Sequence, residues 1–268
     1  MAILTMGRAS ASTLQVSGER KVRDLLSVFG DELASVSVIG LSQDRMPGVS
    51  GLGQPVQVLN PVLARQIAAG VEPKGEAKGA VFKSIARRAA LECTTACLNV
   101  KSSASNRGSF GIGAVVYVSA ETFASNRAIL GNAESGGALQ PFRLRLPVIA
   151  GAPQPLQWQG ITSTWYAGQP NDVGLRGTIA TAGWYVVMVD YHNGLSGLQI
   201  DERAPLISNV SSNTPTMSSV FFGGESQATA MQGGVLAALI CDGPLVQDAA
   251  RNAQFRAYAA AVLDAARV

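Results

Sequence analysis

The sequence of 268 residues is long enough for one large domain or two modest ones, and either can bury a proper core. Only 15% of the residues are charged and 29 are glycine, a balance that favours short strands with many turns over a helical bundle. The formal net charge of +3 comes without a cluster of lysine and arginine, so it gives no support for nucleic-acid binding. The densest basic pair, Arg87–Arg88, is expected to lie in a solvated loop.

Neither targeting signals nor metal-binding motifs stand out. Met1–Met6 lacks the basic leader and apolar core of a secretory signal, and no run approaches the roughly 20 apolar residues of a membrane span. We therefore expect a protein that is made and folded in a cytoplasm, without a membrane partner. Three cysteines and one histidine fit neither a disulfide framework nor a four-ligand metal site, so we predict no metal and no other cofactor.

The first 35 residues differ from the rest of the chain. A small, polar stretch is followed by apolar residues at helical spacing, with Ser17 as a suitable N-cap and Gly30 as a suitable stop. We interpret residues 1–35 as an N-terminal arm with a short helix. Two roles remain open for it: a lid on the domain's own core, or a device that docks on a neighbouring subunit. The docking residues would be Val22, Leu25, Leu26 and Phe29.

Residues 36–78 are expected to form an irregular connecting segment, with a short strand at Val36–Ile39 and a linker-like stretch at Val71–Gly79. Past Gly79, strand signals recur at short intervals between Gly, Pro and Asn turns, without intervening helices. This spacing is typical of a sandwich or jelly roll over residues 79–268. The predicted strands cover 80–82, 89–92, 97–100, 110–118, 128–130, 142–146, 156–158, 177–180, 220–223 and 234–241.

The stretch Gly183–Glu202 is predicted to be the central β-hairpin. Residues 184–191 are rich in aromatic and β-branched types, and both alternating faces are largely apolar, which indicates a strand covered on both sides. His192-Asn193-Gly194 follows, and Asn-Gly supplies the positive φ angles that a tight turn needs. The chain returns through Leu198–Asp201, where apolar and polar residues alternate.

The end of the chain is predicted to be an amphipathic helix packed on the sandwich. From Gln247 to Arg267 the apolar residues fall on one helical face, and Asp248 and Arg267 suit the two ends of the helix dipole. The residues of the apolar face are Phe255, Tyr258, Ala259, Val262, Leu263 and Ala266.

The order of these elements resembles that of laminin-G-like domains of the concanavalin A-like superfamily. The similar stretches are Ala90–Val100, Ser109–Val118, Ala128–Gly131, Gly183–Val189 and Gly233–Leu245, followed by the last helix. The resemblance implies an antiparallel, concanavalin A-like β-sandwich. Domains of this kind occur in carbohydrate-binding proteins and in bacteriophage virion proteins, including fibres and decoration proteins. The Asp and Asn ligand cluster of calcium-binding members is not matched here.

Catalysis is not expected. The Glu-x-Asp-x-x-Glu strand of the superfamily's glycosidases is not matched, and Asp201 and Glu202, as neighbours, point to opposite faces. A serine hydrolase would have to use His192 as its base, because it is the only histidine in the sequence. His192 lies in a predicted hairpin turn, and the sequence contains no Gly-x-Ser-x-Gly motif that would supply the nucleophile. We predict that the protein is not an enzyme.

Sugar binding is a stronger alternative, because aromatic faces beside amide and carboxylate groups suit sugar rings. Packing in the core or at a subunit interface is the simpler interpretation of the same aromatic residues. The candidate ligand-binding residues are Trp158, Trp165, Tyr166, Asn171 and Asp172.

A sandwich of extracellular type without a secretory signal fits a phage structural protein, which leaves the bacterial cytoplasm by lysis. We therefore predict a non-enzymatic virion component, a decoration or tail-fibre protein. It would form homo-oligomers and contact other virion proteins. The alternative is a lectin-like module that binds a glycan.

Overall fold

The computed structural model describes residues 37–40, 75–77, 81–93, 98–101, 109–124, 127–131, 142–146, 148–149, 152–153, 157–160, 166–167, 179–209, 219–224 and 231–265. Over these ranges the chain is mainly β, with two large antiparallel sheets and a C-terminal helix, α3 (Ala249–Ala265). The β-sandwich predicted from the sequence is confirmed. The predicted N-terminal arm, with Val22, Leu25, Leu26 and Phe29, lies outside the described residues.

Sheet A contains eight strands and carries the centre of the fold. Its order is β15–β14–β13–β6–β17–β4–β3, and β1 pairs with the part of β17 that lies beyond β4. The strands are β1 (Ser37–Gly40), β3 (Val81–Ile85), β4 (Arg88–Cys93), β6 (Ser109–Val118), β13 (Gly183–His192), β14 (Leu195–Ile200), β15 (Leu206–Asn209) and β17 (Gly233–Asp242).

Sheet B contains seven strands in the order β12–β11–β8–β7–β16–β5–β2. A small separate pair is formed by β9 (Val148–Ile149) and β10 (Ala152–Pro153), and a 3-10 helix, η3 (Ala120–Ala124), follows β6. The strands of sheet B are β2 (Gly75–Ala77), β5 (Leu98–Lys101), β7 (Arg127–Gly131), β8 (Phe142–Leu146), β11 (Gln157–Gly160), β12 (Tyr166–Ala167) and β16 (Ser219–Phe222).

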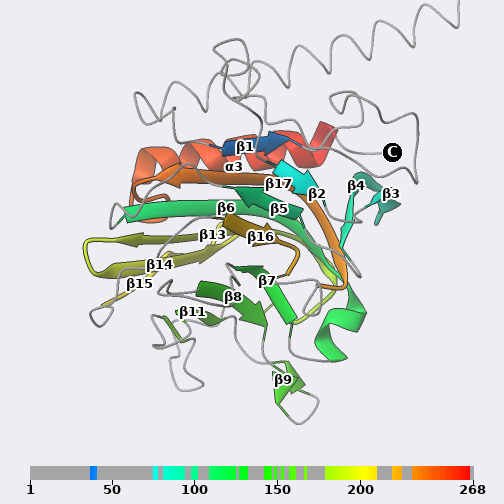
Figure 1. The fold of residues 1–268 in the computed structure, drawn as a ribbon, viewed down its shortest axis with the longest axis horizontal. Helices are drawn as coiled ribbons and strands as arrows, with labels where there is room; N and C mark the ends of the chain where they lie inside the picture. The colour runs from blue at the N-terminus through cyan, green and yellow to red at the C-terminus, as the bar shows by residue number, and fades with distance from the viewer. Residues whose placement is uncertain are drawn as a thin grey trace, which may run out of the picture.

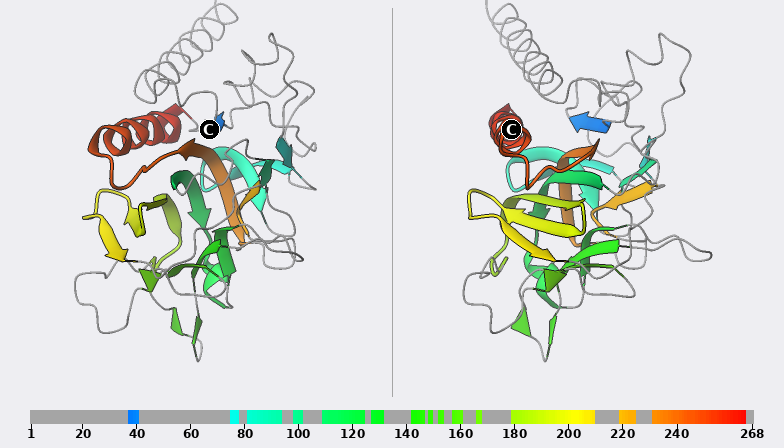
Figure 2. Two further views of the ribbon diagram at one scale, coloured as in Figure 1. Left: turned by 60° about the vertical axis from the view of Figure 1, so that its left-hand side comes forward. Right: turned by 90° about the vertical axis from the view of Figure 1, so that its left-hand side faces the viewer.

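The main core lies between the two sheets. Alternate residues of each strand face it, so Leu144 and Leu146 of β8 in sheet B meet Val187 and Val189 of β13 in sheet A in one buried cluster. A second cluster lies on the other face of sheet A, beneath α3. The molecule therefore has three layers, with α3 above sheet A and sheet B below it (Figures 1 and 2).

Strand β13 is a central strand covered on both sides, as its sequence predicts. It pairs with β6 on one edge and β14 on the other. Val187 and Val189 face the main core, whereas Met188 lies in the cluster under the helix. The hairpin turn is confirmed as well, because Asn193 and Gly194 have φ angles of 48° and 78°.

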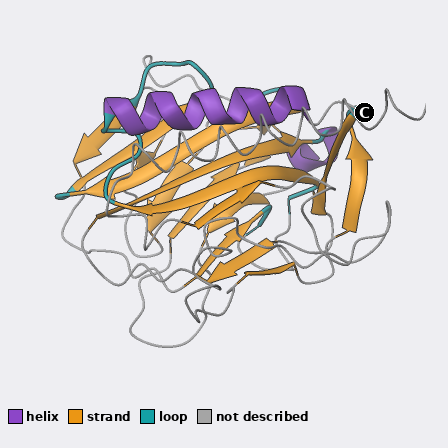
Figure 3. Ribbon diagram, turned by 90° about the horizontal axis from the view of Figure 1, so that it is seen from above, coloured by secondary structure: helices purple, strands orange, loops and turns teal. Residues whose placement is uncertain are grey.

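Helix α3 packs on the outer face of sheet A, as predicted from its apolar face (Figure 3). Phe255, Tyr258 and Ala259 are buried against β6 and β17. The close approach requires Gly113 on β6, because a Cβ there would lie 2.5 Å from the Phe255 ring. Within the described ranges, no helix has the length and apolarity that crossing a bilayer requires.

Two local expectations meet a different structure. Of the strand predicted at 177–180, the described residues 179–180 form no strand, and the backbone bends at Thr181 and Ala182, although Ile179 is buried in the core. Arg87 lies in an exposed turn as expected, but Arg88 begins β4, where its guanidinium lies over the Trp184 ring and its Nε donates to the Leu263 carbonyl of α3 at 2.9 Å.

The segment 36–78 contains β1, close to the short strand predicted at Val36–Ile39, and β2. These strands belong to sheet A and sheet B respectively.

Candidate functional site

Two of the predicted sugar-binding residues lie at one edge of sheet B. Trp158 lies directly opposite Tyr166 in the β11–β12 pair and opposite Leu144 in the β11–β8 pair. Trp165, Asn171 and Asp172 lie outside the described residues.

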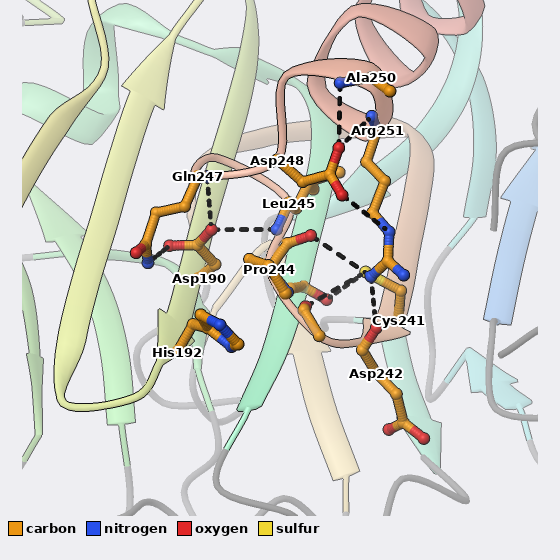
Figure 4. A network of polar contacts seen from close by, with 12 residues as sticks. Asp190, His192, Cys241, Asp242, Pro244, Leu245, Gln247, Asp248, Ala250 and Arg251 are labelled. Carbon is orange, nitrogen blue, oxygen red and sulfur yellow. Dashed lines mark hydrogen bonds and ion pairs between the residues drawn. The ribbon is translucent and has the colours of Figure 1, made fainter.

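A dense polar network joins sheet A to the start of α3 (Figure 4). Its centre is Asp190, a fully buried residue on the helix-facing side of β13. Asp190 Oδ2 accepts hydrogen bonds from the backbone N–H groups of Leu245, Val246 and Gln247, at 3.0, 2.7 and 2.9 Å. Oδ1 accepts a further bond from the Gln247 side-chain amide at 2.9 Å. Burial raises the pKa of Asp190, while these hydrogen bonds act in the opposite direction.

The first turn of α3 is anchored to the same region. Asp248 is the N-cap, because its Oδ1 accepts from the backbone N–H groups of Ala250 and Arg251 at 2.9 and 3.0 Å. Arg251 donates in turn to the Asp242 carbonyl at 2.8 Å. These hydrogen bonds join β13 and the end of β17 to the loop and to the first turn of α3, so they hold α3 on sheet A.

His192 was the only residue around which a hydrolase could be built. Its Nδ1 lies 2.7 Å from Ser109 Oγ, and its Nε2 lies 3.0 Å from Asn193 Nδ2. Which atom donates in each of these two contacts depends on the tautomer of the His192 ring.

The outer face of sheet B, turned away from sheet A, carries a different arrangement. Strand register aligns one residue from each of β11, β8, β7, β16, β5 and β2 in a continuous row across the sheet. Because their chain neighbours Leu144 and Phe222 face the core, Arg143 and Phe221 face outward, and both are half-buried. We call this row the outer row. It consists of Gln159, Arg143, Gly131, Phe221, Asn99 and Glu76.

The same face carries a second basic residue beside the outer row. Arg145 lies two residues after Arg143 on β8, and its register partner on β11 is Gln157. Between the two rows β7 has a bulge at Ala128–Leu130 that keeps Ile129 and Leu130 in the core. Among the residues whose side chains are described, this face therefore carries the two guanidinium groups of β8 and the ring of Phe221.

Sequence reasoning identified most of these strands but not the outer row. The alternation Phe142-Arg143-Leu144-Arg145-Leu146 already shows that two arginines share one face of β8. Which residues lie beside them depends on the strand order. β7 and β11 are close to β8 in the sequence, but β16, β5 and β2 come from distant parts of the chain.

Metal ligands are not grouped in the part of the chain that the structure describes: no three His, Cys, Asp or Glu residues there could hold an ion together. Cys93 and Cys241 are buried thiols in separate clusters.

Comparison with known proteins gives the fold. No family model and no curated protein matches the chain. Among solved structures, it is similar to a mutant Trypanosoma rangeli sialidase that displays trans-sialidase activity, with 13% identity and a TM-score of 0.52 over 96% of this chain and 40% of the sialidase. It is also similar to the binding domain of botulinum neurotoxin serotype D, with 10% identity and a TM-score of 0.51 over 83% of this chain and 52% of that domain.

Both likenesses are consistent with the β-sandwich fold of this chain. The chain spans about half the length of these two proteins or less. At such identities the likeness shows the fold alone, so function has to be argued from this chain's own residues.

Proposed function

We propose that the chain is a non-enzymatic carbohydrate-binding module that holds a glycan on the outer face of sheet B. The outer row is the observation that supports this. Sugar hydroxyls both donate and accept hydrogen bonds, so they suit the guanidinium of Arg143. The half-buried ring of Phe221 is the residue type on which the apolar face of a sugar ring stacks.

The other large face of the sandwich is taken up by packing. Helix α3 covers the outer face of sheet A with Phe255, Tyr258 and Ala259, and the Asp190 network fixes its first turn there. A ligand that binds a sheet face would therefore meet sheet B. The sequence matches neither the Glu-x-Asp-x-x-Glu strand of glycosidases nor the Gly-x-Ser-x-Gly motif of hydrolases, which is why we propose binding without catalysis.

A glycan array with the full-length protein tests the proposal, followed by titration of each positive glycan. Phe221→Ala should weaken binding about tenfold, the scale of one aromatic contact at a binding face. Ile207→Ala is the matched control, because Ile207 is 52% exposed on sheet A and distant from the outer row. Thermal unfolding of both variants separates lost binding from lost fold. An intact protein that binds no glycan, or a Phe221→Ala variant that binds as well as the control, would count against the proposal.

The aromatic stretch predicted from the sequence gives the second location to test. Trp165, Asn171 and Asp172 can be examined on the same array through Trp165→Ala. A loss of binding in Trp165→Ala with no effect of Phe221→Ala would move the site from the outer row to that stretch.

We also keep the proposal that the protein assembles in a bacteriophage virion as a homo-oligomer, with residues 1–35 as its docking element. The sequence argument supports it, through the sandwich of extracellular type and the amphipathic pattern at Val22, Leu25, Leu26 and Phe29. The test compares the solution mass of the full chain with that of a chain lacking residues 1–35. An oligomeric full chain and a folded, monomeric truncation are expected. Identical monomers would refute docking through the arm.

A further inference from the structure

We propose that two copies of this chain pair along the edge strand β15, so that sheet A of one subunit continues into sheet A of the other across a two-fold axis. This inference rests on the homo-oligomer in the proposed function and deepens it by naming a contact surface. Three features of β15 support it: an exposed apolar side chain, the direction of the backbone groups, and a pattern that complements itself.

The edge strand β15 exposes an apolar side chain. Within the described part of the chain, sheet A ends at β15, which pairs with β14 alone. Ile207, inside β15, is 52% exposed, and among the described residues it is the one large apolar side chain exposed to this degree. It lies opposite Gly197, which approaches Val246 on the α3 side of sheet A. An apolar residue on an uncovered sheet edge favours the addition of another strand.

The opposite end of the strand order carries a charge that β15 does not. There β3 has Lys83, which is exposed and forms an ion pair with Glu92 of β4. A lysine on an edge strand opposes pairing with another strand, because the new strand would have to cover its charge. The side chains of Leu206 and Ile207, which are described for β15, are both apolar. Of these two ends of sheet A, β15 is therefore the one suited to pairing.

The register of the central hairpin shows which backbone groups of β15 bond to β14. His192 and Leu195 flank the two-residue turn Asn193–Gly194, and in such a hairpin the flanking residues form a hydrogen-bonded pair. The backbone groups of Leu195 therefore point towards β13. Because the direction alternates along an antiparallel strand, those of Ser196 point towards β15, where its partner is Ser208.

The same alternation directs the backbone groups of Ile207 and Asn209 away from β14, to the outer edge. The next outward position is Pro205, which has a C=O group but no N–H group. A second β15 strand fits this pattern when it lies antiparallel, with Ile207 opposite Ile207 of the second copy. The two Ile207 residues then exchange two hydrogen bonds, and each Asn209 N–H donates to the Pro205 C=O of the other copy. The edge is therefore complementary to itself, as a two-fold contact requires.

This pairing also covers the exposed side chains. With the two-fold axis perpendicular to the sheet, the two Ile207 side chains lie on the same face as direct cross-strand neighbours. The contact is small, because the four residues of β15 cover much less than the roughly 800 Å² that each partner contributes to a typical stable interface. We infer that β15 sets the orientation of the two subunits, while residues 1–35 remain the main docking element.

The first test is disulfide trapping in the full-length protein. The Cα atoms of a directly opposed, hydrogen-bonded pair lie about 5.5 Å apart, within the range that a disulfide bridges. Ile207→Cys should therefore form a covalent dimer on mild oxidation, seen on a non-reducing gel. Ser84→Cys is the matched control, because Ser84 is exposed on β3 at the other end of the strand order. It should form no more covalent dimer than the unmodified protein, which has the same native cysteines.

The second test is the solution mass, measured by analytical ultracentrifugation over a range of concentrations. Ile207→Lys should raise the dissociation constant of the oligomer about tenfold, because a charge at the edge opposes strand pairing, whereas Ser84→Lys should leave it unchanged. Thermal unfolding checks that each variant is folded. An oligomeric protein in which Ile207→Cys cross-links no better than Ser84→Cys would overturn this inference and leave the proposed homo-oligomer standing. A full-length chain that is monomeric at every concentration would overturn both.

Discussion

The sharpest prediction about stability concerns Asp190, which holds the loop between β17 and α3. In Asp190→Ala the backbone N–H groups of Leu245, Val246 and Gln247 lose the oxygen that they share. Leu245 and Val246 are buried, so water cannot easily replace the lost acceptor. We expect the loop to loosen and α3 to lose its attachment to sheet A before the two sheets separate.

The expected cost follows from those contacts. An orphaned buried donor costs about 1–3 kcal/mol, and three donors are affected. Removal of the buried carboxylate relieves its own desolvation, the effect that raises the pKa of Asp190, and this offsets part of the cost. The net loss should be about 3–5 kcal/mol, as when one partner of a buried charged contact is removed. Whole domains unfold with about 5–15 kcal/mol, so the variant should be visibly marginal.

The assay is denaturant unfolding together with amide hydrogen exchange at Leu245–Gln247. Asp190→Asn is the control, because one oxygen remains to accept and the Gln247 amide can turn to meet the new nitrogen. Asp190→Asn should lose clearly less unfolding free energy than Asp190→Ala. If Asp190→Ala lost under about 1 kcal/mol, the acceptor role would be refuted. Equal losses in the two variants would show that the charge matters and the acceptor geometry does not.

Three further changes follow from the same contacts. Gly113→Ala should cost about 1–2 kcal/mol, because its Cβ would lie 2.5 Å from the Phe255 ring, and adding Phe255→Leu should recover part of that loss in a thermal melt. Asp248→Ala should cost about 1 kcal/mol by removing the N-cap of α3, whereas Asp248→Ser should stay within a few tenths in the same denaturant titration. Asp201→Asn keeps the acceptor for the Val186 N–H and suits the φ of 54°, while burial raises the pKa of Asp201. Because the pKa of Asp201 is raised in the folded state, its carboxyl stabilises the unmodified protein in acid, and this stabilisation is lost as the pH rises through the folded pKa. The stability of Asp201→Asn relative to the unmodified protein should therefore increase with pH. A difference in unfolding free energy that does not change with pH would contradict this.

Local sequence patterns predicted those elements whose structure depends on residues close together in the chain. The apolar character of both faces of residues 184–191 identified β13 as a strand with cover on both sides, and Asn193-Gly194 identified its turn. The helical spacing of Phe255 and Tyr258 identified the face of α3 that is buried. In each of these elements, the signal and the structure that it specifies lie within about 20 residues.

Contacts between distant segments could not be predicted in the same way. Asp190 interrupts an apolar face, and its partners at Leu245–Gln247 lie more than 50 residues away. Likewise, the alternation in β8 shows that Arg143 faces away from the core, but only the strand order places Phe221 and Asn99 in the same row. Which residues are neighbours across a sheet depends on the strand order, and no short sequence pattern specifies that order.

The outer faces of the two sheets differ in their residue types. Sheet A has glycines at Gly111 and Gly113 where α3 and its loop approach, so that face is shaped for close packing. Sheet B has Arg143 and Arg145 on its outer face, both half-buried. Solubility alone would be served by lysine, which keeps a strongly hydrated ammonium in water, whereas arginine is the better choice for directed, paired hydrogen bonds. The glycan binding that we propose would use such hydrogen bonds from Arg143 and Arg145, beside the ring of Phe221.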